Sequence, residues 1–568
     1  MRRASLLLLA VLGGSSLADF AAHGDSPPPD VVLVTLDTVR ADRMGFLGSR
    51  RGLTPALDSL ARQAVVFEEA FAEAPLTTVS HATILSGTHP PSHEVQDFGM
   101  PLPAAAPWLP ALLHAAGYRT AAFVGSIVLD PKGGIASGFD RGFDLYDAGF
   151  ERRRNGADPY KTKERRGDEV VARAIAWLDR RGSGRFFLWV HLYDAHDPYD
   201  PPEPYASRHA EAPYEGEIAG VDAAVGRLVD ALRERGVLEG ALVVVAADHG
   251  ESLGEHGEDT HGVFLYDATI HVPLLLRLPG GGEAGRRVGG RVSLVDIAPT
   301  VLDAAGIGIP AAIQGRSLLG LARGRRESER PAYAESEYPR RVFGWSPLRS
   351  WRSERFLYVE APRRELYDLR SDPGATRNIA EDRPAVADGM AAEIERARGA
   401  WSSTHPRAAA TGPSPEVVER LASLGYAAGA TGASPLPPTG VDPKDKIGVV
   451  NLLQRATQAG EEGRWDAAIP IYERVVATDP QIFTARLELG LALARRRDWA
   501  RALPHLELVA ERMPDYADAR FALGLAYASL GRTKDAVREL KAALAKEPGH
   551  RPARALLEKL SEHSGGNE

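Results

Sequence analysis

Two short segments of this chain place an oxygen-bearing side chain where it could take part in chemistry. Asp37 directly follows the apolar run 31–36, and Thr77 opens the run 77–87. A carboxylate after an apolar run is well placed to hold a hard cation, although a lone Asp there also serves as a turn or helix cap. A hydroxyl at the mouth of a short helix faces the positive helix end, which favours an alkoxide and an arriving anionic ester. An ordinary N-cap is the plainer alternative.

Two further segments add imidazoles. Asp248 and His249 follow the apolar run 242–247, and a glycine after them allows close backbone approach. Oxygen and nitrogen donors together suit a transition-metal site. His191 and His196 lie at the end of the apolar run 186–191, and His261 lies downstream of the Asp-His pair. Paired histidines beside a carboxylate could hold a second metal or an anion, whereas a single surface histidine usually does neither.

The elements that would position these residues alternate along the chain. Runs of buried-strand type lie at 31–36, 120–124, 186–191, 242–247 and 272–276, and amphipathic helical stretches lie at 168–180 and 218–235. Such alternation predicts an α/β domain on a largely parallel sheet. Ligands bind such sheets beyond the carboxyl ends of their strands, where the polar segments fall.

The order of these segments carries a family resemblance that none has alone. The order reads LVTLDTVRADRMGFLG, TTVSHATILSGTHPPSHEV, HLYDAHDPY, DHGESLGEHGEDTHGVFLYDATIHVPLLLR and ELYDLRSDPGATRNIA. It resembles the sulfatase branch of the alkaline phosphatase superfamily over about residues 30 to 400. The resemblance implies an alkaline-phosphatase-like α/β/α sandwich and a metal held by Asp37, Asp248 and His249, with Thr77 completing the set.

The resemblance also implies what the metal and the nucleophile are. Thr38 stands where many sulfatases place a second aspartate, so zinc or manganese is favoured, and calcium is possible. Sulfatases oxidise a Cys or Ser to an aldehyde, but Thr77 occupies that position, and threonine, a secondary alcohol, could give only a ketone. Val79 and His81 replace the family's proline and arginine. The site therefore resembles those of superfamily phosphodiesterases and phosphotransferases that use an unmodified threonine.

The expected activity is cleavage of a phosphate diester or related anionic ester through attack by Thr77. His196 and His261 would hold the non-bridging oxygens, bind a second metal or protonate the leaving group. His81, His93 and His191 are expected on the substrate side, and His191 could instead orient other residues from behind. A genuine sulfatase and an inactive scaffold that displays its C-terminal repeats are the alternatives.

Composition limits the partners and the cell compartment. The 568 residues carry a net charge of -8, with 44% hydrophobic and 25% charged residues and no cysteine. Nucleic acid is therefore not an expected partner, and neither disulfides nor thiolate metal sites can form. Residues 1–18 have the charge pattern, apolar run and small-residue end of a secretory signal, which predicts a periplasmic or secreted protein. No other stretch reaches the roughly 18 to 20 apolar residues of a membrane span.

The C-terminal region repeats itself every 34 residues. Three sets of positions show this spacing: Pro480, Pro514 and Pro548; Ala468, Ala502 and Ala536; Gly490 and Gly524. This period resembles tetratricopeptide repeats, here three with a terminal helix, which would bind a protein or peptide. The expected division is a catalytic domain at 27–405, a linker at 406–445 and the repeats at 446–564. A helical bundle without a partner is the alternative.

Overall fold

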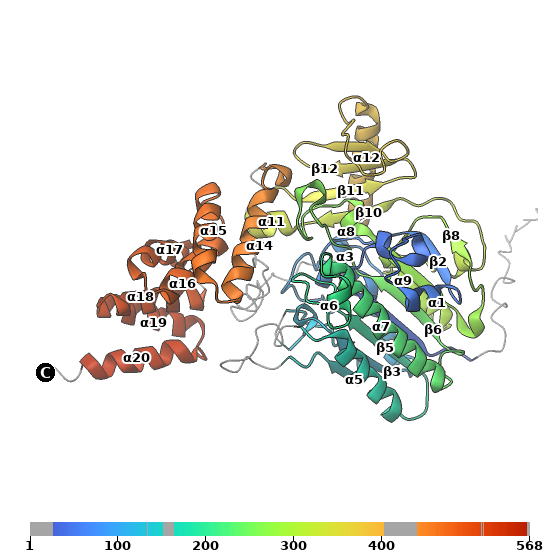
Figure 1. The fold of residues 1–568 in the computed structure, drawn as a ribbon, viewed down its shortest axis with the longest axis horizontal. Helices are drawn as coiled ribbons and strands as arrows, with labels where there is room; N and C mark the ends of the chain where they lie inside the picture. The colour runs from blue at the N-terminus through green and yellow to red at the C-terminus, as the bar shows by residue number, and fades with distance from the viewer. Residues whose placement is uncertain are drawn as a thin grey trace, which may run out of the picture.

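A computed structural model describes residues 27–132, 135–150, 164–402, 440–512, 514 and 516–564. The predicted secretory signal and most of the predicted linker lie outside these ranges. In the described part, the chain forms an α/β domain, a small antiparallel sheet beside it and a row of helices that extends away from both (Figure 1). None of the described helices combines the length and apolar character that crossing a membrane requires.

The central sheet has the order β4-β3-β5-β1-β6-β7-β2-β8, and β9 also pairs with β2. Its middle is parallel: β3 (Arg119–Val124), β5 (Phe186–Leu192), β1 (Val31–Leu36) and β6 (Leu242–Ala247). β7 (His271–Arg277) runs antiparallel to both β6 and β2 (Val65–Phe71). The short edge strands β4 (Leu145–Asp147), β8 (Arg287–Val288) and β9 (Val292–Ser293) pair in parallel. The predicted mostly parallel α/β fold is thus confirmed, with β7 as an antiparallel member.

The strands of the middle are buried because they are apolar throughout. Every residue of β1, β5 and β6 is buried, which is typical of parallel strands covered on both faces. Helices α1 (Pro55–Ala61), α5 (Gly167–Arg180) and α7 (Pro213–Glu234) pack together over the sheet (Figure 1). A second group, α2 (Thr77–Ser86), α4 (Leu109–Ala115) and α9 (Ile297–Ala304), is also in mutual contact.

A second sheet follows the central one in the chain. It consists of antiparallel strands β10 (Ala332–Ser336), β11 (Leu348–Arg352), β12 (Phe356–Glu360) and β13 (Glu365–Asp368). Helix α12 (Pro384–Trp401) packs on it around a separate small apolar core that includes Tyr358, Leu366 and Ile394.

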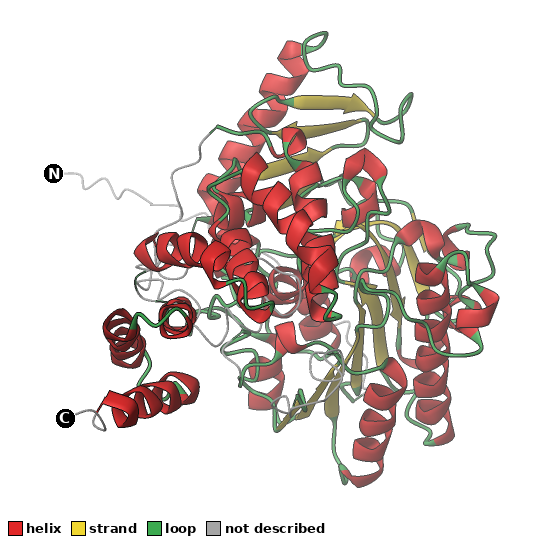
Figure 2. Cartoon of the chain, turned by 60° about the vertical axis from the view of Figure 1, so that its left-hand side comes forward, coloured by secondary structure: helices red, strands yellow, loops and turns green. Residues whose placement is uncertain are grey.

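The repeat region consists of seven helices in succession within the described residues (Figure 2). They are α14 (Ile447–Glu461), α15 (Trp465–Thr478), α16 (Phe483–Arg495), α17 (Trp499–Arg512), α18 (Ala517–Ser529), α19 (Thr533–Lys546) and α20 (Arg551–Ser564). A Cβ atom at Gly490 would lie 2.7 Å from Leu506 Cδ2, and one at Gly524 would lie 3.0 Å from Leu540 Cγ. The repeated glycines therefore permit close helix crossings.

The described end of the predicted linker is packed against the preceding domain. The backbone N–H of Ser346 donates to Val441 O at 3.0 Å, and the N–H of Arg363 donates to Asp442 Oδ2 at 3.0 Å. A short helical turn, η8 (Pro443–Asp445), then leads into α14. The repeat helices thus start from a fixed point on the catalytic domain.

Candidate active site

The register of the parallel strands brings the predicted metal ligands to one edge of the sheet. Leu36 at the end of β1 pairs with Ala247 at the end of β6. Asp37 and Asp248 directly follow these residues, and their backbone N–H groups donate to Leu192 O and Leu36 O at 2.9 and 3.2 Å. The two carboxylates therefore leave neighbouring strands side by side, as expected at the carboxyl edge of such a sheet.

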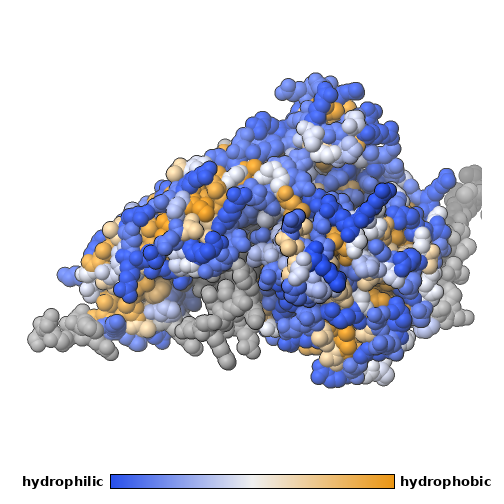
Figure 3. Space-filling view, viewed as in Figure 1, coloured by the Kyte–Doolittle hydropathy of each residue, from blue (hydrophilic) through white to orange (hydrophobic). Residues whose placement is uncertain are grey.

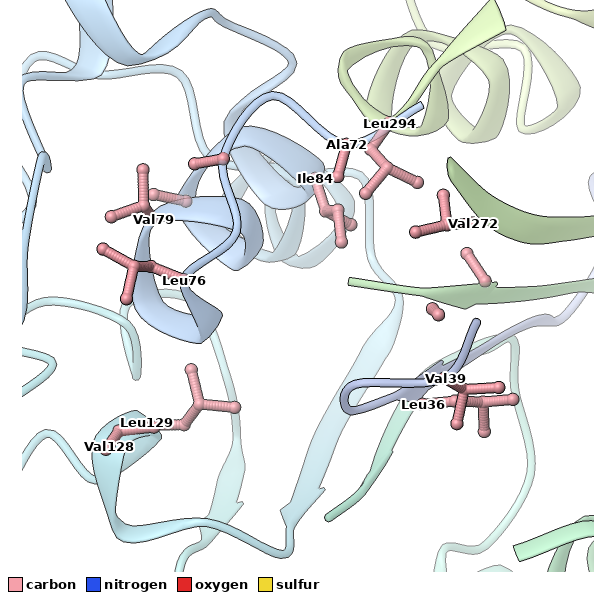
Figure 4. Close-up of a cluster of buried hydrophobic side chains, with 14 of the residues drawn as sticks. Leu36, Val39, Ala72, Leu76, Val79, Ile84, Val128, Leu129, Val272 and Leu294 are labelled. Atoms are coloured by element: carbon pink, nitrogen blue, oxygen red, sulfur yellow. The ribbon is translucent and has the colours of Figure 1, made fainter. Parts of the chain in front are cut away.

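Thr77 reaches the same point from α2. It is the first residue of this helix, and the preceding residue, Leu76, provides no side-chain cap. Leu76 and Val79 belong to a buried hydrophobic cluster with Val128 and Leu129 (Figure 4), which fixes the start of the helix. The Thr77 hydroxyl therefore lies in the field of the positive helix end.

Three side chains offer ligand atoms that lie within 4.8 Å of one another: Asp37, Asp248 and His249. His249 Nε2 lies 3.9 Å from Asp37 Oδ1, 3.6 Å from Asp248 Oδ2 and 3.3 Å from the Thr77 hydroxyl oxygen. All four side chains are completely buried. The predicted set of Asp37, Thr77, Asp248 and His249 is thus assembled in one place.

Unpaired oxygen atoms show that this cluster fits a cation. Asp37 Oδ1 and Asp248 Oδ2 are both buried and have no hydrogen-bond partner among the described residues. Burial raises the pKa of Asp37 to about 7, and the attraction of His249 opposes this rise. Burial and the nearby Asp37 charge also raise the pKa of Asp248. Two buried carboxylates that each keep one oxygen without a partner are costly unless a positive charge lies between them.

The tautomer of His249 supports the same conclusion. Its Nδ1 lies 3.0 Å from Gly250 O, and only a protonated Nδ1 can donate to that carbonyl. Nε2 therefore presents a lone pair toward the two carboxylates. Three electron-rich groups facing one another, with a hydroxyl beside them, match the mixed oxygen and imidazole ligands of a divalent metal.

The other oxygen of Asp248 is held by the backbone. Asp248 Oδ1 accepts hydrogen bonds from the N–H groups of His249 at 2.7 Å and of Thr38 at 3.4 Å. Thr38 adopts a left-handed backbone conformation with φ of 54°, and its hydroxyl lies 2.7 Å from Ala195 O. Thr38 therefore shapes the turn after β1.

His191 lies behind the metal cluster. Its Nε2 is 3.0 Å from Asp37 Oδ2, and its Nδ1 accepts from the N–H of Gly125 at 3.4 Å. Burial lowers the pKa of His191 to about 4, so the ring is neutral. With Nδ1 accepting, Nε2 carries the proton and donates to Asp37. The structure thus matches the orienting role considered for His191, and both of its nitrogens are engaged within the protein.

His81 lies beneath Thr77. Its Nδ1 is 2.8 Å from Thr77 O, and its Nε2 is 3.0 Å from the hydroxyl of Thr35, whose oxygen also accepts from Trp189 Nε1 at 2.9 Å. Burial lowers the pKa of His81 to about 3. The ring is therefore neutral and supports the first turn of α2. His81, His191 and Asp248 also lie within metal-binding distance, but all four ring nitrogens already have partners.

His93 lies farther along, against the last turn of α2. The N–H of Val95 donates to His93 Nδ1 at 3.2 Å, and His93 Nε2 lies 3.0 Å from the hydroxyl of Thr83. The ring is completely buried. As placed, His81 and His93 have no nitrogen left for a substrate, in contrast to the contacts expected from the sequence.

His196 and His261 form the other wall of the site. The His261 ring lies 4.6 Å from the His249 ring and 4.9 Å from the His196 ring, measured between centroids. His196 Nδ1 lies 2.5 Å from Asp197 O, and Tyr193 stacks on its ring. Burial lowers the pKa of His196 to about 3 and that of His261 well below its usual value.

Glu251 is a site residue that the sequence reasoning missed. Its Oε1 lies 2.9 Å from His261 Nδ1, and both side chains are almost fully buried. Burial and the nearby charge of Asp197 raise the pKa of Glu251 well above its ordinary value. Its position three residues after Asp248 was a usable signal, because an acid near a metal ligand often orients a histidine.

Comparisons with known proteins find relatives for both parts of this chain. Residues 29–307 match the sulfatase family, residues 254–398 match the N-sulphoglucosamine sulphohydrolase C-terminal family, and residues 453–512 and 493–560 match tetratricopeptide repeats. An arylsulfatase of Clostridium perfringens is 26% identical, over 62% of this chain and 90% of that protein. A Delta 4,5-hexuronate-2-O-sulfatase of Bacteroides thetaiotaomicron is 25% identical, over 65% of this chain and 88% of that protein. The crystal structure of a phosphonate monoester hydrolase of Agrobacterium radiobacter is 25% identical and superposes with a TM-score of 0.56, over 66% of this chain and 96% of that one.

Proposed function

We propose that this chain hydrolyses a phosphate diester or a phosphonate monoester with Thr77 as the nucleophile. The chain belongs to the sulfatase family and carries C-terminal tetratricopeptide repeats. The observation that carries this proposal is the Thr77 hydroxyl, which lies 3.3 Å from His249 Nε2 at the edge of a buried, cation-binding cluster. Sulfatase-family relatives and the phosphonate monoester hydrolase place the reaction class among anionic ester hydrolyses.

The substrate preference follows from the nucleophile. Formation of the aldehyde nucleophile needs a primary alcohol or a thiol at this position. Thr77 is a secondary alcohol, and the chain has no cysteine. A threonine oxygen can attack phosphorus directly, which gives a phosphoryl ester of its own side chain. The first step forms the bond between Thr77 Oγ1 and phosphorus and breaks the bond between phosphorus and the leaving alcohol. Water then releases the product and restores the hydroxyl.

In the first step, the proton of the Thr77 hydroxyl must pass to a group beside it. With a metal bound, His249 Nε2 would be a ligand, so the carboxylate of Asp37 is the group beside the hydroxyl that can accept its proton. The positive end of α2 favours the alkoxide and the incoming anion. A divalent metal held by Asp37, Asp248, His249 and Thr77 would act as a Lewis acid that stabilises the alkoxide and the ester oxygen.

His261 lies against the ring of His249, and His196 lies next to His261. The contact between Glu251 Oε1 and His261 Nδ1 fixes the orientation of the His261 ring. We assign to His261 the contact with a non-bridging oxygen or the leaving group, and to His196 a second contact beside it. Zinc or manganese is the metal that we favour for the mixed ligand set.

A genuine sulfatase is the second candidate, because the curated relatives at 25 to 26% identity are sulfatases. The test is turnover of p-nitrophenyl sulfate, bis(p-nitrophenyl) phosphate and p-nitrophenyl phenylphosphonate by full-length protein loaded in turn with zinc, manganese and calcium. The proposal expects kcat/KM to be highest for a phosphorus ester with zinc or manganese. Faster turnover of the sulfate would favour the second candidate.

Export and partner binding complete the proposal. We propose that residues 1–18 direct the protein to the periplasm or the exterior, and that the repeats bind a protein or peptide. The matches of residues 453–512 and 493–560 to tetratricopeptide repeats support the second point, and Figure 3 shows hydrophobic residues over the repeat helices as well as over parts of the α/β domain. Fractionation of cells that express the full-length chain tests the first point, since retention in the cytoplasm would contradict it.

A further inference from the structure

The loop that carries His261 is closed on itself. It runs from Glu251, whose side chain contacts His261 at 2.9 Å, to His261 itself. The N–H of Ser252 donates to Thr260 O at 2.7 Å, so the two ends of the loop are tied together. A movement of the loop tip is therefore passed to Thr260 and to the histidine that directly follows it.

The tip of this loop has little regular structure of its own. Gly254, His256 and Gly257 all have a positive φ, at 101°, 54° and 85°. The only helical element at the tip is the short 3-10 turn Glu255–Gly257, and the N–H of Gly254 donates to Glu258 O at 2.9 Å. Contacts from outside the loop add to these few bonds of its own.

The first repeat helix, α14, provides such contacts. Asn451 accepts a hydrogen bond from the N–H of Asp259 at 3.3 Å and donates from Nδ2 to Gly257 O at 2.8 Å. Gln454, three residues later on the same face, donates from Nε2 to the Thr260 hydroxyl at 2.8 Å. These two side chains therefore hold the tip of the loop and the residue next to His261.

Two further contacts lie around these hydrogen bonds. Arg455 forms an ion pair with Asp259 at 2.5 Å. A Cβ atom at Gly257 would lie 3.5 Å from Ile447 Cγ2, so α14 packs directly against the loop backbone. Val449, Val450 and Leu453 of the same helix are buried in the hydrophobic core that continues from the catalytic domain.

We propose that Asn451 and Gln454 are positioning residues for the reaction, which act from the repeat domain by fixing the loop that presents His261. The inference rests on the proposed function, because it takes His261 as the residue that contacts the ester. The repeat domain is thereby part of the framework of the active site, and its first helix links the repeats to catalysis.

The test compares three forms of the metal-loaded, full-length protein: wild type, the double variant Asn451→Ala with Gln454→Ala, and Asp445→Ala. Asp445→Ala is the matched control, since it removes the ion pair with Arg363 at the same junction, at 2.8 Å, without touching the loop. Measured are metal content, kcat and KM on the three p-nitrophenyl esters named above, and hydrogen exchange of residues 252–260.

We expect the double variant to lose about 10- to 100-fold in kcat, because a displacement of about 1 Å in a positioned group has an effect of this size. KM and metal content stay near wild type, and exchange of residues 252–260 becomes faster. In a His261→Ala background the same two substitutions cause no further loss, which a general destabilisation would not reproduce. The control behaves as wild type.

Two results would overturn the inference. One is wild-type kcat and wild-type exchange in the double variant. The other is an equal loss of kcat with and without His261. A wild-type protein that turns over none of the esters would instead remove the proposed function, and exchange of residues 252–260 would then decide alone whether α14 holds the loop.

Discussion

Removal of the metal should make the stability of this protein depend on pH in an unusual direction. Burial raises the pKa of Asp37 to about 7, whereas an Asp in an unfolded chain titrates at 3.8. Between these values the folded protein holds a proton on Asp37 that the unfolded chain has released. The protonated Asp37 therefore makes its full contribution to the stability of the metal-free protein below about pH 4, and this contribution is lost as the pH rises through 7.

The magnitude follows from the difference between the two pKa values. Going from pH 5 to pH 8 costs the metal-free fold about 2 to 3 kcal/mol through Asp37 alone. For a domain of this size that is a fall of about 3 °C in Tm. Asp248 adds in the same direction, because its pKa is also raised. Metal binding needs the ionised carboxylates, so affinity for the metal should rise over the same pH range.

Thermal unfolding of chelator-treated protein between pH 5 and pH 8 measures this effect. Asp37→Asn is the matched comparison, because it keeps the shape and an acceptor for His191 but removes the titration. The Tm difference between wild type and Asp37→Asn should change by about 3 °C in favour of the variant as the pH rises. Parallel curves for the two proteins, or a wild type that gains stability with pH, would refute the reasoning.

Four other substitutions, at three residues, test separate parts of the site. Thr77→Ala should lower kcat by 1000-fold or more while metal content and Tm stay near wild type. Thr77→Ser should retain measurable turnover, since a hydroxyl remains. Kinetics and metal analysis measure both effects, and full activity in Thr77→Ala would show that Thr77 is not the nucleophile. Asp248→Ala should lose metal as well as activity, because it removes one of the two carboxylates that have a buried oxygen without a partner. Elemental analysis measures the metal, and full metal content would contradict the assignment of Asp248 as a ligand. His93→Ala should lower the free energy of unfolding by about 1 to 3 kcal/mol with kcat nearly unchanged, because both nitrogens of His93 have partners within the protein. A loss of kcat at unchanged Tm would instead indicate that His93 contacts the substrate.

Much of the scaffold was predictable because the buried strands are apolar throughout. The strands Val31–Leu36 and Leu242–Ala247 coincide with the apolar runs in the sequence, and neighbouring parallel strands must end at one edge. The sequence pattern therefore placed Asp37 and Asp248 at the carboxyl edge of the sheet, and the family resemblance joined them in one site, whereas the pairing of their strands is known only from the structure. The antiparallel direction of β7 could not be predicted, since its apolar run reads the same in both directions.

The roles of individual histidines were less predictable, because a role depends on what each ring nitrogen faces. His81 stands where the related motif has an arginine, yet the hydroxyl of Thr35 and Thr77 O occupy its two nitrogens. Nothing in the local sequence of His81 reports these partners. The contact of Asn451 with the loop before His261 joins residues almost 200 positions apart, so a periodic repeat pattern gives no sign of it.

Trapping the reaction on the protein tests the role of Thr77 most directly. Metal-loaded wild type is mixed with bis(p-nitrophenyl) phosphate, quenched with acid within one turnover, digested and analysed by mass spectrometry. We predict a phosphoryl ester on the side chain of Thr77, in a peptide whose threonine is otherwise unmodified, and no such adduct in Thr77→Ala. Rapid turnover with an unlabelled Thr77, or an adduct on a different residue, would contradict the account.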